Sequence, residues 1–327
     1  MNLNTQPVPT SGGLRLIHRP SPPLWEARQP GQVFVVEQHS KPLSSGPGLM
    51  FSALIPDMDH FKGSEGGRTL PMLHPDGSGN TSPCLLSTLA TLLDVPVTVE
   101  DLTAYIAAAV AHPAFVGRFT DELTTPGIRV PITSDPVLWT QAVDVGRQVV
   151  WLHTYGDAFA DKGAGRPVGN VRFPAGDPRQ PQSLTAVTGM PDTIAYDVDT
   201  ATVSLGDGQW GPVRPEVWAY DVGGKNVLRS WFNYRKAVPG GKKTSPLDYV
   251  HVDVWPAEWT IEFIDLLTVL TRLVDLEAEQ AKLLGDVLAG DVLTMEALAA
   301  EGVRWPAGPA DRKPRYGLPG EQHTMDI

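Results

Sequence analysis

The longest regular pattern in this chain is helical and runs from Trp259 to Leu288. Leu, Val and Ile recur there at helical spacing, at positions 261, 264, 267, 270, 273, 274 and 276. A helix with such a face needs other parts of a protein to bury it. The pattern therefore predicts a long C-terminal helix and a fold in which that helix is a principal packing element.

Strand patterns occur in two other regions. Val33–Val36 and Leu49–Ile55 are short apolar runs bounded by Gly and Pro. Ile194–Val198 and Thr202–Leu205 flank Asp199-Thr200-Ala201, which predicts a β-hairpin.

Further helices are predicted between the two strand regions. Thr98 and Asp101 have the spacing of a capping box before an alanine-rich helix that Pro113 interrupts. Asp135-Pro136 begins another helix, whose apolar face comprises 138, 142, 145, 149 and 152. The predicted fold class is α+β, with a mixed, largely antiparallel sheet and a helical part that includes the long C-terminal helix.

The chain divides by composition into three parts. Residues 1–13 are expected to form a disordered lead-in, and 291–327 a small helix followed by a mobile tail. The main region, 14–290, is expected to form two lobes, 14–160 and 190–290, joined by the Gly- and Pro-rich residues 160–192.

Length and composition exclude several classes of protein. At 327 residues the chain can bury a substantial core. It has no apolar run of the ~20 residues that span a bilayer and no signal-peptide pattern, so no membrane association and a cytoplasmic location are expected. Cys84 is the single cysteine, which excludes an intrachain disulfide and a cysteine-based metal cluster.

Two glycine-rich stretches resemble phosphate-binding motifs only in part. Gly206-x-Gly208-x-x-Gly211 is followed by Pro212 and Pro215, so no helix can begin there to bind a pyrophosphate, and a hairpin turn is predicted. The 239–244 stretch has Lys243 where a phosphate loop requires Ser or Thr after Gly241-Lys242, and it is interpreted as a basic surface loop.

No catalytic or metal site is predicted. Asp57, Asp59 and His60 could form a fragment of a divalent-metal site, but such a cluster is more often solvated. His153 is expected at a helix C-terminus without a catalytic partner, and Cys84 is expected to be a buried small residue.

One basic segment contrasts with the acidic whole. Residues 221–250 contain six Lys or Arg against two Asp, a balance of +4, in a chain of net charge −11. Asn226 is expected to cap a helix carrying Arg229, Trp231, Asn233, Tyr234, Arg235 and Lys236, before a loop with Lys242 and Lys243. Arg and Asn are residue types that read base edges, so the segment is compatible with nucleic-acid contact. It is equally compatible with a solvated face above core residues Trp231 and Phe232.

Several segments together resemble a known family. They are LIHRPSPPLWEA, LSSGPGLMFSALIPDMDHF, TPGIRVPIT, VGRQVVWLHTYG, VLRSWFNYRK, GGKKTSPLD and WPAEWTIEFIDLLTVLTRLVDLE. In this order they resemble the C-terminal specificity (target-recognition) domain of Type ISP restriction–modification enzymes, from about Arg15 to Gly290. The methyltransferase motif Asn/Asp-Pro-Pro-Tyr/Phe does not occur, because Pro22-Pro23 is followed by Leu24. A helicase phosphate loop is also missing, so the chain is expected to be the specificity part without the nuclease, helicase and methyltransferase, as a split subunit or the product of a truncated gene.

The resemblance implies sequence-specific recognition of duplex DNA in a phage-defence system, with the target adenine positioned for a methyltransferase or nuclease acting in trans. It implies base or phosphate contact by Arg229, Asn233, Arg235 and Lys236, phosphate contact by Lys242 and Lys243, and a second contact loop with Lys41, Ser44 and Ser45. Within this chain no activity and no cofactor are expected. S-adenosylmethionine, ATP and Mg²⁺ are expected only on the partner domains, a methyltransferase and motor subunit.

Two alternatives remain open. The chain could be a catalytically competent adenine methyltransferase or restriction component, which the missing motifs disfavour. It could also be an acidic assembly module that does not itself bind DNA, which the net charge of −11 favours.

Overall fold

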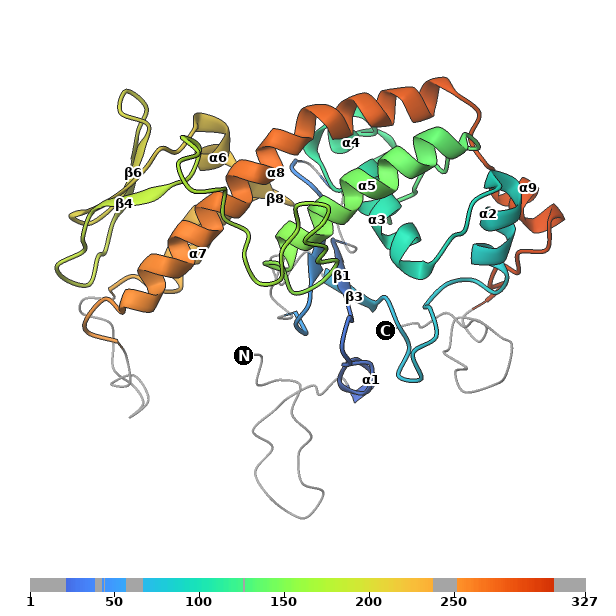
Figure 1. Ribbon diagram of the computed structural model, residues 1–327, viewed down its shortest axis with the longest axis horizontal. Helices are drawn as coiled ribbons and strands as arrows, with labels where there is room; N and C mark the ends of the chain where they lie inside the picture. Colours follow the sequence, from blue (N-terminus) through green and yellow to red (C-terminus); the bar gives the residue numbers. More distant parts are fainter. Residues whose placement is uncertain are drawn as a thin grey trace, which may run out of the picture. The chain divides into compact units, whose positions relative to one another are not determined.

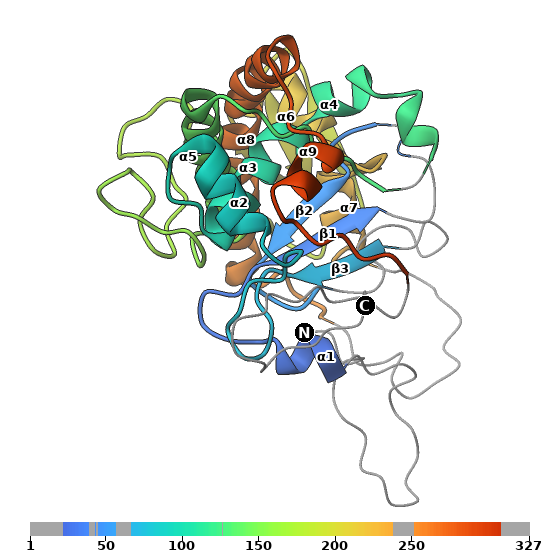
Figure 2. The same ribbon diagram turned by 90° about the vertical axis from the view of Figure 1, so that its right-hand side faces the viewer.

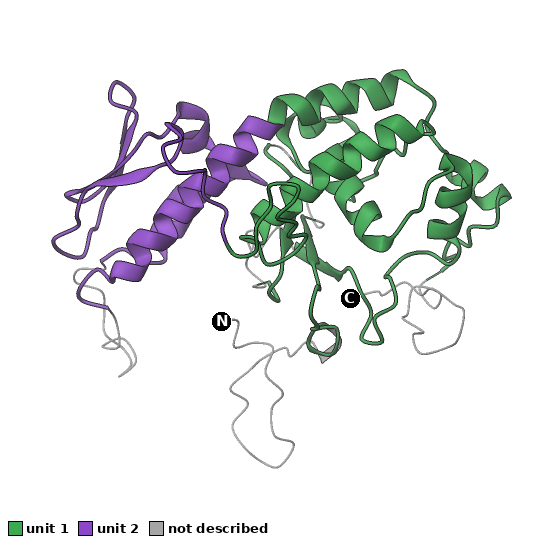
Figure 3. Cartoon of the chain, in the orientation of Figure 1, with its two compact units in different colours: residues 1–169, 277–327 green, residues 170–276 purple. Residues whose placement is uncertain are grey.

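The computed structural model describes residues 22–38, 43, 45–56, 67–125, 127–237 and 252–308. The fold is α+β with antiparallel sheets and a long C-terminal helix, as the sequence predicts (Figure 1). Two compact units make up the chain (Figure 3). Unit 1 comprises residues 1–169 and 277–327, and unit 2 comprises 170–276.

Unit 1 contains a three-stranded antiparallel sheet in the order β2-β1-β3 (Figure 2). The central strand β1 (Phe34–Gln38) pairs with β2 (Leu49–Ser52) and β3 (Gly67–Pro71). Both strands predicted from the first apolar runs are confirmed. Phe34, Val36 and Phe51 are buried, so the sheet contributes to the core of this unit.

The rest of unit 1 is mainly helical. Its elements are α1 (Pro22–Glu26), α2 (Leu85–Leu93), α3 (Val99–Val110), α4 (Pro113–Arg118), the 3₁₀ turn η3 (Glu122–Thr124), α5 (Pro136–His153) and α9 (Met295–Ala300). The capping box of Thr98 and Asp101 is confirmed at the start of α3, and Asp135 accepts hydrogen bonds from two backbone N–H groups at the start of α5. These caps satisfy amides that a helix N-terminus otherwise leaves unpaired.

The closest helix packing in unit 1 joins α3 and α5. A Cβ atom on Gly146 would lie only 1.7 Å from the carbonyl oxygen of Ala104, so glycine is required for the two backbones to approach this closely. On α5, the predicted apolar positions Ala142, Val145, Val149 and Leu152 are buried. Gln280, which is also in unit 1, donates its side-chain amide to the carbonyl oxygens of Ala107 and Ala108. The buried amide is thus satisfied by two carbonyl oxygens of α3.

Unit 2 contains a four-stranded antiparallel sheet in the order β4-β7-β6-β5. The predicted hairpin is confirmed as β5 (Ile194–Asp197) and β6 (Thr202–Leu205), and β7 (Gly208–Gly211) follows the turn predicted at Gly206. The edge strand β4 (Gln182–Thr185) lies within the region expected to be a connection. All four of its residues are exposed, so it has no apolar alternation from which a strand could be predicted.

The predicted long helix is α8 (Ala257–Ala289), whose residues up to 276 belong to unit 2 and whose remainder belongs to unit 1. Leu267, Leu270 and Leu273 are buried as expected, whereas Ile261 is 52% exposed. Phe263 takes the inward position in the first turns and meets Trp210 of β7 edge to face at 5.1 Å between ring centroids. No helix in the described part of the chain is long and apolar enough to cross a membrane.

Candidate nucleic-acid interface

The basic segment begins with a tight hairpin and a capped helix in unit 2. Strands β8 (Asp221–Val222) and β9 (Lys225–Asn226) are joined by Gly223 and Gly224, both with positive φ, and α7 (Val227–Asn233) follows. The side-chain oxygen of Asn226 accepts a 2.9 Å hydrogen bond from the backbone N–H of Arg229. The predicted cap is confirmed.

The inner face of α7 is anchored in the core of unit 2. Leu228 and Phe232, four residues apart, are buried. Trp231 packs on Phe263 with ring centroids 4.9 Å apart. The interpretation of Trp231 and Phe232 as packing residues is therefore confirmed, and α7 presents its opposite face to solvent.

The outer face of α7 presents Arg229 and Asn233, which lie four residues apart and are exposed. The helix ends at Asn233, so the prediction that it carries Tyr234, Arg235 and Lys236 is wrong. The N–H groups of Arg235 and Lys236 both donate to the carbonyl of Phe232 in a tight final turn. We call the exposed or half-buried residues Lys225, Arg229, Asn233, Tyr234 and Lys236 the α7 surface.

Arg235 differs from the other basic residues of the segment. Its guanidinium lies 4.1 Å from the ring centroid of Trp231 and donates to Glu262 Oε2 at 3.0 Å. It also donates to the carbonyl of Trp231 at 3.2 Å. These contacts tie Arg235 to the packing between α7 and the start of α8.

Arg229 has the opposite arrangement. Its guanidinium carbon lies 5.0 Å from the ring centroid of Trp218 in α6 (Pro215–Ala219), and no carboxylate among the described residues pairs with it. The arginines of unit 2 that do form ion pairs with carboxylates are Arg172, Arg179, Arg214 and Arg235. Arg272 of unit 2 donates to the backbone carbonyls of residues 171 and 172. Among the residues that the structure describes, no carboxylate thus takes up the hydrogen-bond donors of Arg229.

The structure adds two residues that the sequence interpretation did not assign to the site. Tyr234 is 75% exposed, and the ammonium of Lys225 lies 5.7 Å from its ring centroid. An exposed aromatic ring between basic residues suits stacking or phosphate contact. In the sequence, the only indication that Tyr234 belongs to the candidate site is its position among the basic residues of the segment.

Several predicted contact residues lie outside the described part of the chain: Lys41, Ser44, Lys242 and Lys243. Ser45 is exposed, shortly before β2 in unit 1. The three residues considered for a metal, Asp57, Asp59 and His60, also lie outside that part. Among the residues that are described, no cluster of three His, Cys, Asp or Glu side chains could hold a metal ion.

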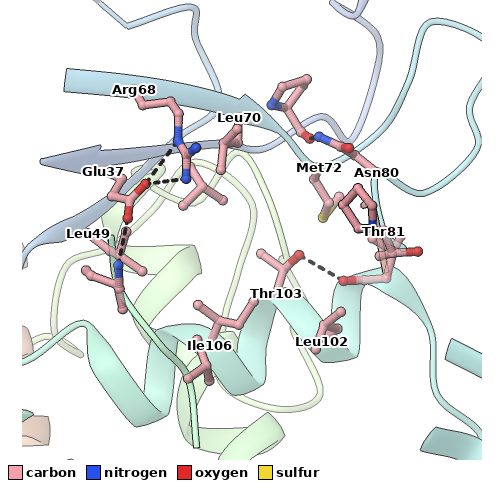
Figure 4. Close-up of a pocket in the computed structure, with 16 residues that line it drawn as sticks. Glu37, Leu49, Arg68, Leu70, Met72, Asn80, Thr81, Leu102, Thr103 and Ile106 are labelled. Atoms are coloured by element: carbon pink, nitrogen blue, oxygen red, sulfur yellow. Dashed lines mark hydrogen bonds and ion pairs between the residues drawn. The ribbon is translucent and has the colours of Figure 1, made fainter. Parts of the chain in front are cut away.

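Unit 1 contains a cavity of about 490 Å³ between its sheet and α3 (Figure 4). Its wall is mostly apolar, and Glu37 forms an ion pair with Arg68 at 2.8 Å on the strand side. Glu37 also accepts the N–H of Ile128 at 2.8 Å. Both Glu37 oxygens are thus engaged in holding the fold, and neither is arranged as a general acid or base.

His153 and Cys84, the two other residues considered for catalysis from the sequence, each lie at one end of a helix. His153 ends α5 as predicted, and its Nδ1 accepts the N–H of Phe51 at 3.2 Å, which links α5 to β2. Cys84 precedes α2 and is exposed, so the expectation that it is buried was wrong. Its φ of 66° lies in the left-handed region and turns it outward.

Similarity to known proteins extends over most of the chain. The family model of the Type ISP C-terminal specificity domain matches residues 12–266. No curated protein matches the chain. A cryo-EM structure of a DrdV–DNA complex is similar at 17% identity and a TM-score of 0.53, covering 80% of this chain and 25% of that chain.

Two further structures are similar at lower TM-scores. One is a nuclease-deletion mutant of the Type ISP restriction–modification enzyme LlaGI in complex with a DNA substrate mimic, with 13% identity, a TM-score of 0.48, and coverage of 80% of this chain and 21% of that one. The other is the ATP-dependent Type ISP enzyme LlaBIII bound to DNA, with 12% identity, a TM-score of 0.48, and coverage of 80% and 16%. The chain thus spans a quarter or less of the length of these proteins.

Proposed function

This chain belongs to the family of Type ISP C-terminal specificity domains, and we propose that it recognises a short DNA sequence for a restriction–modification system. The observation that carries the proposal is the family match over most of the chain. The structural likeness to a DrdV–DNA complex supports the shared fold.

The α7 surface supplies the chemistry that the proposal needs. Between Asp221 and Asp248 the sequence has six basic residues and no acidic one. Lys225 and Lys236 are suited to phosphate contact, which gives affinity without sequence preference. Arg229 and Asn233 have side chains that can make paired hydrogen bonds to base edges. Arg235, which the sequence interpretation placed in the contact set, would support this surface from below through Trp231.

In this proposal the chain has no chemistry of its own. It would hold the target adenine in register for a methyltransferase and nuclease acting in trans, with S-adenosylmethionine, ATP and Mg²⁺ bound by those partners. Flipping of the adenine would take place in the methyltransferase. The setting would be DNA methylation and phage defence in the cytoplasm.

The test is selection of bound sequences from a randomised duplex pool by the full chain, followed by affinity measurement on the selected duplex. The wild type is expected to enrich one short motif. The double variant Arg229→Ala/Lys236→Ala should bind the motif at least about tenfold more weakly, since one paired base contact is worth about 1–3 kcal/mol.

A matched control removes the same charges elsewhere. Arg118 and Lys162 are exposed residues of unit 1, and Arg118→Ala/Lys162→Ala should bind like the wild type. Equal weakening by both double variants would make the loss a net-charge effect and contradict a role for α7. Failure of the wild type to enrich any motif would favour the assembly-module alternative.

A further inference from the structure

We propose that Arg229 reads a guanine in the major groove, and that Trp218 and Tyr196 position it for this role. The inference rests on the proposed function and deepens it. It assigns one base of the recognised sequence to one side chain, and it names two aromatic residues whose task is to orient that side chain.

The three side chains form a continuous stack drawn from three elements. The rings of Tyr196 in β5 and Trp218 in α6 are nearly parallel, with centroids 5.4 Å apart and an interplanar angle of 16°. The Arg229 guanidinium of α7 lies over the Trp218 ring. Stacking on an indole restricts a long and otherwise mobile side chain, so less entropy is lost when it binds.

Hydrogen bonds hold the Tyr196 hydroxyl and the backbones of Trp218 and Arg229. The hydroxyl of Tyr196 donates to the carbonyl of Val213 at 2.9 Å. Burial, and then the nearby carboxylates of Glu216 and Asp197, raise the pKa of Tyr196 further above its ordinary value of 10.0. The side-chain amide of Asn226 donates to the carbonyl of Trp218 at 2.8 Å, while its oxygen caps α7 at Arg229. One residue thus ties the backbone of Trp218 to the backbone of Arg229.

The outer edge of Arg229 suits guanine. A guanidinium presents two parallel N–H donors, and guanine presents the acceptors O6 and N7 side by side in the major groove. The ion-paired arginines of unit 2 use such donors on carboxylates, whereas Arg229 is exposed and pairs with no described carboxylate. Phosphate contact needs only a positive charge, which a flexible side chain can supply. The stacked, oriented guanidinium of Arg229 is therefore better suited to a base edge than to phosphate.

The experiment uses the duplex selected by the wild-type chain, with each guanine replaced in turn by 7-deazaguanine, which lacks the N7 acceptor. One replacement should weaken wild-type binding by about fivefold, at the lower end of the about 5- to 150-fold discrimination of a full paired contact, since it removes one of the two acceptors. The same replacement should have no effect on Arg229→Ala. Arg229→Lys retains the charge and should retain the salt dependence of binding, while its sensitivity to that guanine falls.

The positioning role has its own variants. Trp218→Leu should lose sensitivity to the same guanine with an unchanged salt dependence, whereas Trp218→Phe, which keeps a ring face, should retain it. Circular dichroism confirms that each variant is folded. If Trp218→Leu and Trp218→Phe behave alike, the stack has only a structural role.

The outcomes separate this inference from the proposed function. A selected motif without guanine, or one in which no 7-deazaguanine affects wild type and Arg229→Ala differently, would overturn guanine reading and leave sequence recognition standing. Failure to select any motif would overturn the proposed function itself.

Discussion

At the scale of single residues, two arginines of one short segment have different environments. Arg235 is enclosed by Trp231 and Glu262, while Arg229 lies on the outer side of Trp218 with its donors clear of described carboxylates. The exposed ion pair of Arg235 contributes little by itself, about 0–1 kcal/mol, so its main value is packing on the indole. A substitution of Arg235 therefore tests stability as much as DNA contact, and Arg229 is the cleaner probe.

His112 provides a pH prediction at the same scale. It is buried, and burial lowers its pKa from the ordinary 6.5 to about 4. Between these values the unfolded chain binds a proton that the folded chain does not. Stability should therefore be complete above pH 6.5 and fall as the pH drops toward 4, by up to about 3 kcal/mol for this group.

The measurement is the free energy of unfolding in urea from about pH 4 to about pH 7 for the wild type and His112→Gln. The carboxylates contribute equally to both proteins, so the difference between the two curves isolates His112. The variant should show a shallower fall on acidification. Parallel curves would show that His112 does not titrate as its burial implies.

At the scale of elements, the contact between α3 and α5 depends on one missing side chain. Gly146→Ala would place a methyl group against the Ala104 carbonyl, and overpacking of this kind typically costs about 1–3 kcal/mol. The better helix propensity of alanine, about 1 kcal/mol, offsets only part of this cost. We expect a lower melting temperature for Gly146→Ala.

Gly285 is the matched control because it lies within α8, and a Cβ atom added there would meet no other atom within 4 Å. Gly285→Ala should raise the melting temperature, since it gains helix propensity without a clash. Similar shifts for the two variants in calorimetry would show that α3 and α5 can separate at little cost.

At the scale of the whole molecule, the net charge of −11 limits how the chain can bind DNA. Phosphate contacts must come from a local basic surface, because the rest of the protein is repelled. Six basic residues lie between Asp221 and Asp248, and Arg235 is already engaged. Arg229 is assigned to a base, so four residues remain for phosphate, and they would give a slope of log affinity against log salt of at most about −3.6.

A salt titration of binding to duplex DNA measures this slope. A steeper value would place further phosphate contacts elsewhere, for example at the Lys41 loop. A slope near zero would mean that the α7 segment does not touch phosphate at all. Either result would require a different interface from the one proposed.

The sequence alone was sufficient for the local features of this protein. The capping residues Thr98, Asp135 and Asn226, the 194–205 hairpin and the long helix were predictable because each depends on neighbours in sequence. The family was recognisable from several segments in order. The strand β4 could not be predicted, because its exposed residues show no alternation of apolar and polar side chains and only its pairing with β7 defines it.

The tertiary structure decided which of the similar side chains are available. In sequence, Arg229 and Arg235 are equivalent members of a basic helix, and Tyr234 is one aromatic among several. Their difference arises from residues of other elements: Trp218 of α6 beside Arg229, and Glu262 and Trp259 of α8 beside Arg235. Burial and ion pairing depend on neighbours in three dimensions. Only the tertiary structure therefore distinguishes Arg235, which packs beneath the α7 surface, from Arg229 and Tyr234, which are exposed on it.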